Sequence, residues 1–424
     1  MGSGELQRDP RWNRRARPAW LRTLNAMGRG LEAVGVRPVR LDEVTLLSQA
    51  QRRTGLSDFG QEGFREPLRL LLDAIEREAE LTLMGRWMAR WEIRNHLENR
   101  LRVIEVMKRC PEIEAQKICA PIFITGSGRS GTSILHELLA TDPRHRALCH
   151  WEALFPCPPP DTVTRDRDPR IPRAQRDVDL WERIAPAYRT MHEGGADAPQ
   201  ECDYLLNLEL LSDHISGAYQ VPSYARWLAR ADRRPAYAMH RTVLRILQWK
   251  LPTEQWVLKA PSHLGQLETL FAVYPDARVV QTHRDPLKVL ASMTSLVTTL
   301  YWLRSDRVDP RAVAAAYAKG VAHLVNHSLE QRETGLLPEE QFCDVRYTDY
   351  KADPIQTVRD VYDRFGMALT SEAEMRMRDH LAARHHQHDP QGHRYTFEDT
   401  GLDPARERTR FRAYQERFDI PSEL

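Results

Sequence analysis

The sequence predicts an α/β protein in which a mostly parallel sheet is flanked by helices. Two observations support this fold class. Short apolar runs that read as strands occupy residues 122–125, 256–259, 278–283 and 341–346. Each precedes a segment that reads as a helix, at residues 131–140, 264–274, 286–300 and 354–365. Strands that alternate with helices favour a parallel sheet with right-handed crossovers.

Ligands of such sheets bind at the carboxyl ends of the strands. Thr125, Lys259 and Arg284 all lie at or just beyond the ends of predicted strands. Although they are far apart in the sequence, we therefore expect these three residues to meet at one site.

Two helical regions are expected around the sheet. Residues 1–117 carry no strand signal, and apolar residues recur there at helical spacing, so we predict an N-terminal helical region before an α/β domain at 118–424. A mostly helical insertion, residues 155–250, separates the first two predicted strands. Its aromatic residues form either the wall of a lid over the site or the insertion's own core: Trp181, Tyr188, Tyr204, Tyr219, Tyr224 and Trp227.

Composition excludes several classes of protein. The chain has 424 residues, 42% hydrophobic and 28% charged, and its net charge of +2 gives no basis for nucleic-acid binding. No apolar run approaches the ~20 residues of a membrane-spanning helix, and no signal-peptide pattern follows the first methionine. The six cysteines lack metal-like spacing. We therefore expect a cytoplasmic protein with reduced cysteines.

Two charged segments leave alternatives open. The first 20 or so residues are rich in Arg and form either a solvated tail or an arm that contacts a neighbouring subunit in a homo-oligomer. A tract near the C-terminus contains His385, His386, His388 and His393. Clustered histidines bind metals, but a solvent-facing helix end is favoured because Asp389 is the tract's single carboxylate. We predict no metal site.

The segment between the first predicted strand and its helix is the most informative part of the chain. It reads Gly126-Ser-Gly-Arg-Ser-Gly-Thr-Ser133. A strand, a glycine loop and a helix start direct several backbone N–H groups at one anion. The spacing of Gly126 and Gly131 resembles a Walker A loop, but Thr132 occupies the position of its lysine. The loop therefore predicts a phosphate site that differs from that of a Mg-ATP enzyme.

A second segment supplies a further cation. The strand at 278–283 runs into His283-Arg284-Asp285-Pro286, and Pro286 suits the first turn of a helix. Arg284 and Ser292 lie eight residues apart. Alone, this pattern also fits a helix cap with a local ion pair. Beside the first loop, it indicates a second phosphate site.

Together these segments resemble the sulfotransferases that use 3′-phosphoadenosine 5′-phosphosulfate (PAPS), and the resemblance is nearest to the bacterial and tyrosylprotein branches. It implies a P-loop-type fold like that of nucleotide kinases. It also implies that the loop residues bind the 5′-phosphosulfate: Gly128, Arg129, Ser130, Gly131, Thr132 and Ser133. Arg284 and Ser292 would bind the 3′-phosphate. Tyr347, in a Tyr-x-x-x-x-x-Asp-Pro segment, would lie near the adenine.

The resemblance also implies catalytic roles. Sulfuryl transfer needs cations at the bridging oxygen of the leaving adenosine 3′,5′-bisphosphate (PAP), and no metal by necessity. Arg129 is one candidate. Lys259 is the other, because it matches the lysine of the tyrosylprotein enzymes' Lys-Asp-Pro element, although Ala260 replaces the Asp.

A general base must accept the proton of the acceptor hydroxyl. The bacterial and tyrosylprotein branches use a glutamate after the second strand, and the segment from Cys149 to Pro156 occupies that place. We therefore predict Glu152 as the base. His150 is the competing candidate, since the cytosolic branch uses a histidine.

The leading prediction is a PAPS-dependent sulfotransferase that modifies a hydroxyl group of a small-molecule or lipid-like acceptor. Two other functions remain open. One is a P-loop kinase, which the missing Walker lysine disfavours. The other is a nucleotide-binding protein without turnover, which the candidate base and cations disfavour. The acceptor's identity does not follow from the sequence.

Overall fold

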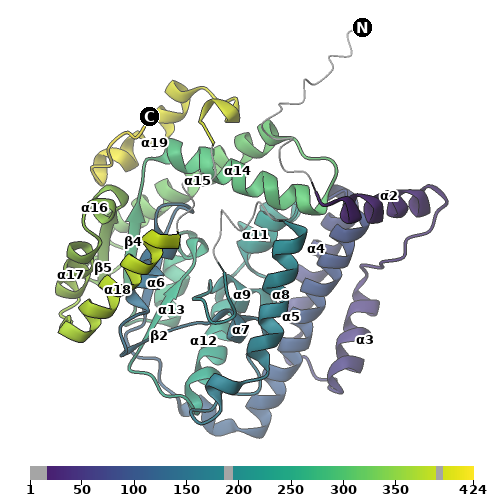
Figure 1. Cartoon of the computed structure of the whole chain (residues 1–424), viewed down its shortest axis with the longest axis horizontal. Helices are drawn as coiled ribbons and strands as arrows, with labels where there is room; N and C mark the ends of the chain where they lie inside the picture. Colours follow the sequence, from purple (N-terminus) through teal and green to yellow (C-terminus); the bar gives the residue numbers. More distant parts are fainter. Residues whose placement is uncertain (1–16, 186–193, 388–394) are drawn as a thin grey trace.

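The computed structural model describes residues 17–185, 194–387 and 395–424. A five-stranded sheet forms its centre, with every neighbouring pair parallel, in the order β2-β3-β1-β4-β5 (Figure 1). The strands are β1 Ile122–Gly126, β2 His145–Ala147, β3 Gln255–Lys259, β4 Arg278–His283 and β5 Phe342–Arg346. Because all five are parallel, their carboxyl ends share one edge of the sheet.

Both faces of the sheet are buried because successive strand residues point to opposite sides. Ile122 and Ile124 pack into one apolar cluster with residues of the helices α6 Thr132–Leu139, α16 Tyr347–Ala352, α17 Pro354–Arg364 and α18 Ser371–Gln387. Phe123 points to the other face and belongs to the main core. That core includes residues of α12 Arg234–Trp249, α13 Leu267–Val273 and α15 Pro310–Glu333.

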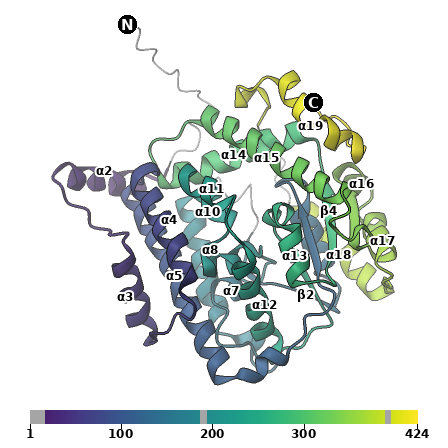
Figure 2. The same cartoon turned by 180° about the vertical axis from the view of Figure 1, so that it is seen from behind.

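A layer of helices stands beside the α/β part, as Figure 2 shows from behind. The N-terminal members are α2 Ala19–Ala33, α3 Glu43–Thr54, α4 Arg65–Glu78 and α5 Leu83–Arg109. The others come from the stretch after β2: α7 His150–Leu154, α8 Arg170–Ile184, α9 Asp203–Leu206, α10 Asp213–Ala218 and α11 Pro222–Leu228. The described part of the first 117 residues therefore contains helices and loops but no strand, and its one isolated β-bridge joins Leu81 to Ser305.

Buried ion pairs join the helical layer to the rest of the chain. Arg304, at the end of α14 Pro286–Arg304, donates to Glu92 of α5 at 2.9 Å. Arg100 of α5 pairs with Glu209, which follows α9. Both arginines are almost fully buried, and a buried guanidinium is tolerated only when it is paired and hydrogen-bonded. The N-terminal helices are therefore packed firmly onto the later segments.

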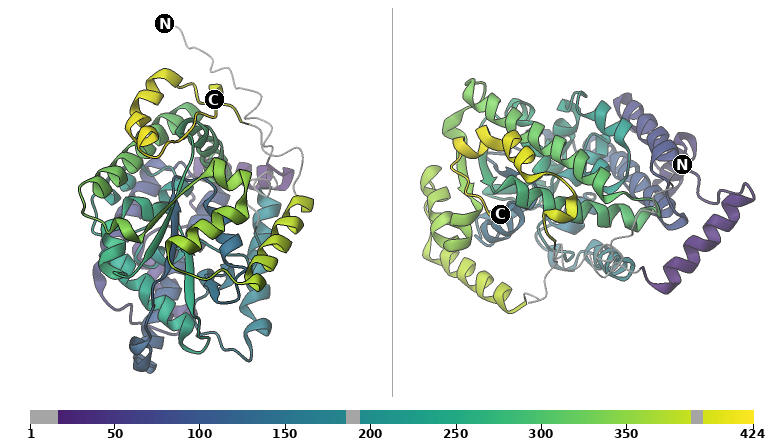
Figure 3. Two further views of the ribbon diagram at one scale, coloured as in Figure 1. Left: turned by 90° about the vertical axis from the view of Figure 1, so that its left-hand side faces the viewer. Right: turned by 90° about the horizontal axis from the view of Figure 1, so that it is seen from above.

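The carboxyl edge of the sheet lies under three further segments. Helices α14 and α15 cross above the strand ends, and α19 Pro404–Arg417 follows over them (Figures 1 and 3). The last residues of the chain then return toward the start of α14, where the Glu423 N–H donates to Asp285 at 2.7 Å. The site predicted at the strand ends is thus roofed by α14, α15 and the C-terminal segment.

The predicted fold class is confirmed, with two differences in detail. β2 was not predicted, because His145–Ala147 is three residues long and has no β-branched side chain. The helix expected at 264–274 is a 3₁₀ turn, Pro261–Gly265, followed by α13. Most of the Arg-rich segment predicted as a tail or arm lies outside the described residues.

Candidate active site

The glycine loop joins β1 to α6 in the predicted place. β1 ends at Gly126, and α6 begins at Thr132 with Gly131 as its N-cap. Gly131 has φ +95°, and a Cβ at Gly126 (φ +147°) would lie 2.5 Å from the carbonyl oxygen of Thr282. Only glycine fits these two positions at little cost. The loop is thus folded tightly against β4, with the N-terminus of α6 at its end.

Ser130 acts within the loop. Its side chain is 1% exposed, and its hydroxyl lies 2.5 Å from the Ser127 carbonyl oxygen and 2.6 Å from the Thr282 hydroxyl. Its backbone N–H also donates to Ser127. Both groups of Ser130 therefore stabilise the loop's shape. Gly128, Thr132 and Ser133, by contrast, lie on the wall of the adjoining cavity.

Arg129 connects the glycine loop to the second predicted motif. Its φ of +69° is uncommon for a residue with a side chain, and such strain gathers at functional sites. Its Nε donates to the Ser292 hydroxyl at 3.1 Å. Its carbonyl oxygen accepts from Arg284 Nη1 at 3.0 Å. Arg129, Arg284 and Ser292, which the sequence assigned to one nucleotide, therefore lie together.

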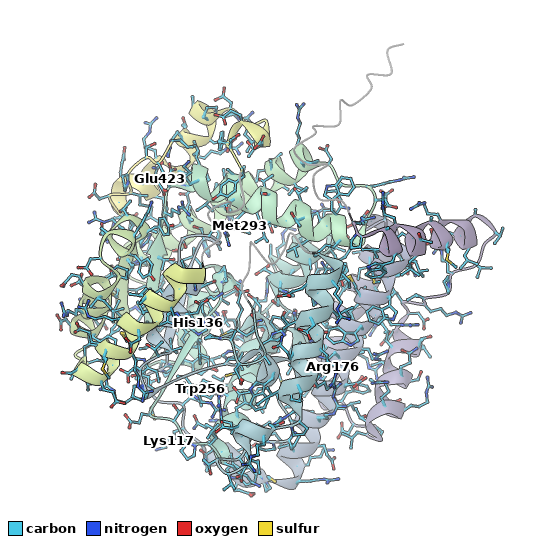
Figure 4. All side chains as sticks on the ribbon, in the orientation of Figure 1. Lys117, His136, Arg176, Trp256, Met293 and Glu423 are labelled. Carbon is cyan, nitrogen blue, oxygen red and sulfur yellow. The ribbon has the colours of Figure 1, made fainter. Side chains whose placement is uncertain are left out.

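Arg284 has a partner that the sequence did not predict. Its Nε and Nη2 donate to the two carboxylate oxygens of Glu423, each at 3.0 Å. The ring of Tyr347 lies against the guanidinium, with its centroid 4.0 Å away. Figure 4 labels Glu423 and Met293 at the same end of the sheet, opposite Lys117, which precedes β1. The C-terminal segment thus places a carboxylate on the proposed 3′-phosphate arginine.

Lys259 lies at the end of β3, with its side chain 3% exposed. Its ammonium group donates to the Ser133 hydroxyl at 3.2 Å and to Glu201 Oε1 at 2.5 Å. Ser133 belongs to the first turn of α6, so the lysine reaches the end of the glycine loop from the neighbouring strand. Burial of this cation is balanced by the Glu201 carboxylate.

The two predicted bases lie in different surroundings. Glu152 is fully buried and accepts from Arg146 Nη2 at 2.6 Å and from the Cys149 N–H at 3.2 Å. It is absent from the cavity wall in the described part of the chain. His150 does line the cavity, and its Nδ1 accepts from Gln200 Nε2 at 2.8 Å.

A cavity of about 1670 Å³ opens from the glycine loop into the helical layer. Its wall includes both ends of the predicted site, from Arg284 and Tyr347 to Glu201 and His150. Small-molecule sites typically enclose 300–1,000 Å³, so this cavity has room for two ligands. Apolar residues of α14 and α15 form one side: Met293, Leu296, Val297, Leu300, Tyr301, Val313, Tyr317, Val321 and Leu324.

The aromatic residues of the insertion divide between the two roles considered. Trp181 and Tyr204 line the cavity. Tyr219 and Tyr224 are buried in the main core, and Trp227 packs against it. Tyr188 lies outside the described residues. The insertion is therefore both a packed unit and part of the cavity wall.

Asp203 is a buried acid on the same wall. Its Oδ1 accepts from the hydroxyls of Ser212, at 2.5 Å, and Ser262, at 2.8 Å. Burial raises the pKa of Asp203 to about 6, and the nearby charge of Glu201 adds to the shift.

Comparisons with known proteins agree with this geometry. A model of the sulfotransferase family matches residues 121–372. The chain belongs to the sulfotransferase family. Its structure is similar to that of sulfotransferase STF1 from Mycobacterium tuberculosis, with a TM-score of 0.79 and 35% identity over 89% of this chain and 100% of that one. It is also similar to STF9 from Mycobacterium avium, with a TM-score of 0.83 and 30% identity over 92% and 99% of the two chains.

Among curated relatives, the chain is 27% identical over 281 residues to omega-hydroxy-beta-dihydromenaquinone-9 sulfotransferase Stf3 of Mycobacterium bovis and Mycobacterium tuberculosis. That match spans 62% of this chain and 66% of the relative's length. The predicted membership of a family of enzymes is confirmed.

Two features of this sulfotransferase-family chain were missed by the sequence predictions. Glu201 lies in a loop of the insertion with no motif, and Glu423 is the penultimate residue. A physical argument could have pointed to an acidic residue such as Glu201, because a lysine predicted at a buried strand end needs an anionic partner.

Two kinds of feature are absent from the described residues. No group of three His, Cys, Asp or Glu side chains there is arranged to hold a metal ion. None of the helices in the same residues is long and apolar enough to cross a membrane. The side chains of the predicted histidine tract, 385–393, lie outside the described residues.

Proposed function

We propose that this protein transfers a sulfuryl group from PAPS to a hydroxyl group of a small-molecule or lipid-like acceptor. One observation carries the proposal. Arg129 hydrogen-bonds to both Arg284 and Ser292, and the two arginines line a cavity large enough for donor and acceptor together. A cluster of cations beside a helix N-terminus suits a nucleotide that carries phosphate groups at both ends of its ribose.

The donor's groups are assigned to three places. The 5′-phosphosulfate would lie against the loop at the start of α6, among Gly128, Thr132 and Ser133. The 3′-phosphate would bind Arg284 and Ser292, and the adenine would lie near Tyr347. Because the Glu423 carboxylate pairs with Arg284, the 3′-phosphate must replace it there. Two anions in one position repel each other, so the C-terminal segment has to shift when the nucleotide binds.

Arg129 and Lys259 would stabilise the leaving group. As the bond between sulfur and the bridging oxygen breaks, negative charge develops on the 5′-phosphate of PAP. Fixed cations that face this charge lower the barrier without reorganising. Lys259 is already held against the loop by Ser133, as this role requires.

The acceptor would bind in the part of the cavity lined by α14, α15 and the insertion. The apolar side chains there suit a lipid-like molecule with one hydroxyl group near the loop. The relative Stf3 is named for a hydroxylated menaquinone, which supports an acceptor of this class. Glu152 and His150 remain the bases predicted from the sequence.

The test is direct transfer. The protein is incubated with PAPS and a lipid extract, and mass spectrometry detects a gain of one SO₃ on a hydroxylated component. The Lys259→Ala variant serves as the control. PAP binding without transfer would favour the non-catalytic alternative, and phosphate transfer from Mg-ATP would favour the kinase.

A further inference from the structure

Glu201 lies at the junction of the donor and acceptor parts of the cavity. Its Oε1 is 2.5 Å from the Lys259 ammonium group, and the same ammonium donates to Ser133 on the first turn of α6. The side chain of Glu201 remains 24% exposed, whereas that of Lys259 is 3% exposed. The carboxylate therefore connects the phosphate loop, through one lysine, to the open space of the cavity.

Backbone hydrogen bonds on both sides fix Glu201 at the sheet edge. The Gln200 N–H donates to Leu148 at 2.7 Å, and the Cys202 N–H donates to the Lys259 carbonyl oxygen at 2.9 Å. The Glu201 N–H donates to the side-chain oxygen of Gln200 at 2.8 Å. Although Glu201 belongs to a loop, hydrogen bonds of both neighbouring residues hold its backbone against other segments, as the positioning of a catalytic group requires.

The two bases predicted from the sequence are less well placed. The Glu152 carboxylate is enclosed with Arg146 and lies off the cavity wall among the described residues. His150 lines the cavity, but the Gln200 amide donates to its Nδ1, since the amide oxygen is occupied by the Glu201 N–H. A neutral His150 then carries its proton on Nε2, so neither nitrogen offers an unshared electron pair to an acceptor hydroxyl.

We infer that Glu201 is the general base that accepts the proton of the acceptor hydroxyl; this inference rests on the proposed function. The acceptor oxygen forms a bond to sulfur while its O–H bond breaks, and the proton passes to a Glu201 carboxylate oxygen. The bond between sulfur and the bridging oxygen breaks, and its electron pair stays on the 5′-phosphate of PAP. Lys259 keeps its hydrogen bond to Ser133 and faces that developing charge, while its attraction to Glu201 weakens because the carboxylate is neutralised by the proton.

The test compares wild type with Glu201→Gln, which keeps the size of the side chain but removes its basic oxygen. PAPS is the donor, and the acceptors are water and phenols of increasing acidity, from 4-methylphenol to 4-nitrophenol. For 4-methylphenol we expect kcat to fall by about 10²-fold or more, the scale of general-base catalysis. For the more acidic 4-nitrophenol the loss should be smaller, because its proton leaves with less help. Binding of PAP should change little.

Two further variants separate this role from others. Glu201→Asp keeps a carboxylate and should retain more activity than Glu201→Gln. Glu209→Gln removes the anionic partner of buried Arg100 outside the cavity, so it controls for the loss of a buried ion pair and should keep kcat.

Each remaining outcome decides against the assignment. An equal loss for all phenols would show that Glu201 only positions Lys259. An unchanged kcat would exclude it from the chemistry. If the wild type binds PAP but transfers a sulfuryl group to no acceptor, the proposed function fails together with the assignment of Glu201. If the wild type does transfer the group and Glu201→Gln is equally active, only the assignment of Glu201 fails and the proposed function stands.

Discussion

The two halves of the cavity, proposed above for the donor and for the acceptor, differ in how they are built. The donor half comes from contiguous motifs at the ends of parallel strands: the loop after β1, Lys259 at the end of β3, Arg284 after β4 and Tyr347 after β5. The acceptor half comes from single residues on α8, α9, α14 and α15, with no motif among them. The donor half is therefore readable from the sequence, whereas the acceptor half depends on how distant helices pack.

The largest expected effect lies at the boundary of the two halves. Lys259→Ala removes a fixed cation from the leaving group, which typically costs about 10²- to 10³-fold in kcat. Affinity for PAP should change less, because the charge at issue develops only during transfer. Steady-state kinetics and calorimetry measure the two quantities, with exposed Lys250→Ala as the matched control. Weak PAP binding with normal kcat at saturation would make Lys259 a binding residue only.

The donor half should discriminate between nucleotides through Arg284. Hydrogen bonds to charged groups contribute on the order of 1.5–3 kcal/mol, so wild type should prefer PAP to adenosine 5′-monophosphate by about 10- to 150-fold. Arg284→Ala should remove most of that preference. Arg278→Ala, at the other end of β4, should leave it intact. Equal affinity of wild type for the two nucleotides would refute the 3′-phosphate site.

Glu152 tests whether the sequence or the geometry identifies the base. Glu152→Gln leaves Arg146 without its anionic partner, so the free energy of unfolding should fall by about 1–3 kcal/mol. The Glu152 side chain lies off the described cavity wall. At urea concentrations below the unfolding transition, the kcat of the variant should therefore stay near that of wild type. Urea unfolding and kinetics on the same samples provide both values. A 10²-fold loss of kcat at unchanged stability would restore Glu152 as the base.

Glu423 should have a smaller effect in the opposite direction. Glu423→Gln removes the anion that a 3′-phosphate must displace from Arg284, so PAP should bind more tightly. Partly exposed ion pairs contribute up to about 1 kcal/mol, which limits the gain to about fivefold. Calorimetry with PAP tests this, and in an Arg284→Ala background the gain should vanish. Weaker binding by Glu423→Gln would mean that the carboxylate assists the nucleotide.

The last expected effect concerns stability rather than activity, and it is a pH dependence of Tm on the acceptor side. Since burial raises the pKa of Asp203 to about 6 from an unfolded value near 3.9, its protonated form favours the folded state. That contribution is complete below about pH 4 and is lost as the pH rises through about 6. Asp203→Asn should therefore flatten the dependence of Tm on pH between these values. An identical pH profile for variant and wild type would contradict the shift.

How much could be predicted from the sequence also differs between the donor half and the acceptor half of the cavity. The strands β1, β3, β4 and β5 and the meeting of Arg129, Arg284 and Ser292 were predictable, because apolar runs and strand ends are local signals. Glu201 and Glu423 were not, because each is defined by a partner more than 50 residues away: 58 residues to Lys259 and 139 to Arg284. The burial of Glu152 and its ion pair with Arg146 could not be predicted either. They depend on how β2, which carries Arg146, and α7, which carries Glu152, pack in the folded protein.

A crystal structure of the protein with PAP tests the central claim about the donor site most directly. The account predicts the 5′-phosphate at the N-terminus of α6 and the 3′-phosphate within hydrogen-bonding distance of Arg284 and Ser292, with Glu423 displaced. PAP bound elsewhere, while Glu423 keeps both of its hydrogen bonds to Arg284, would contradict it.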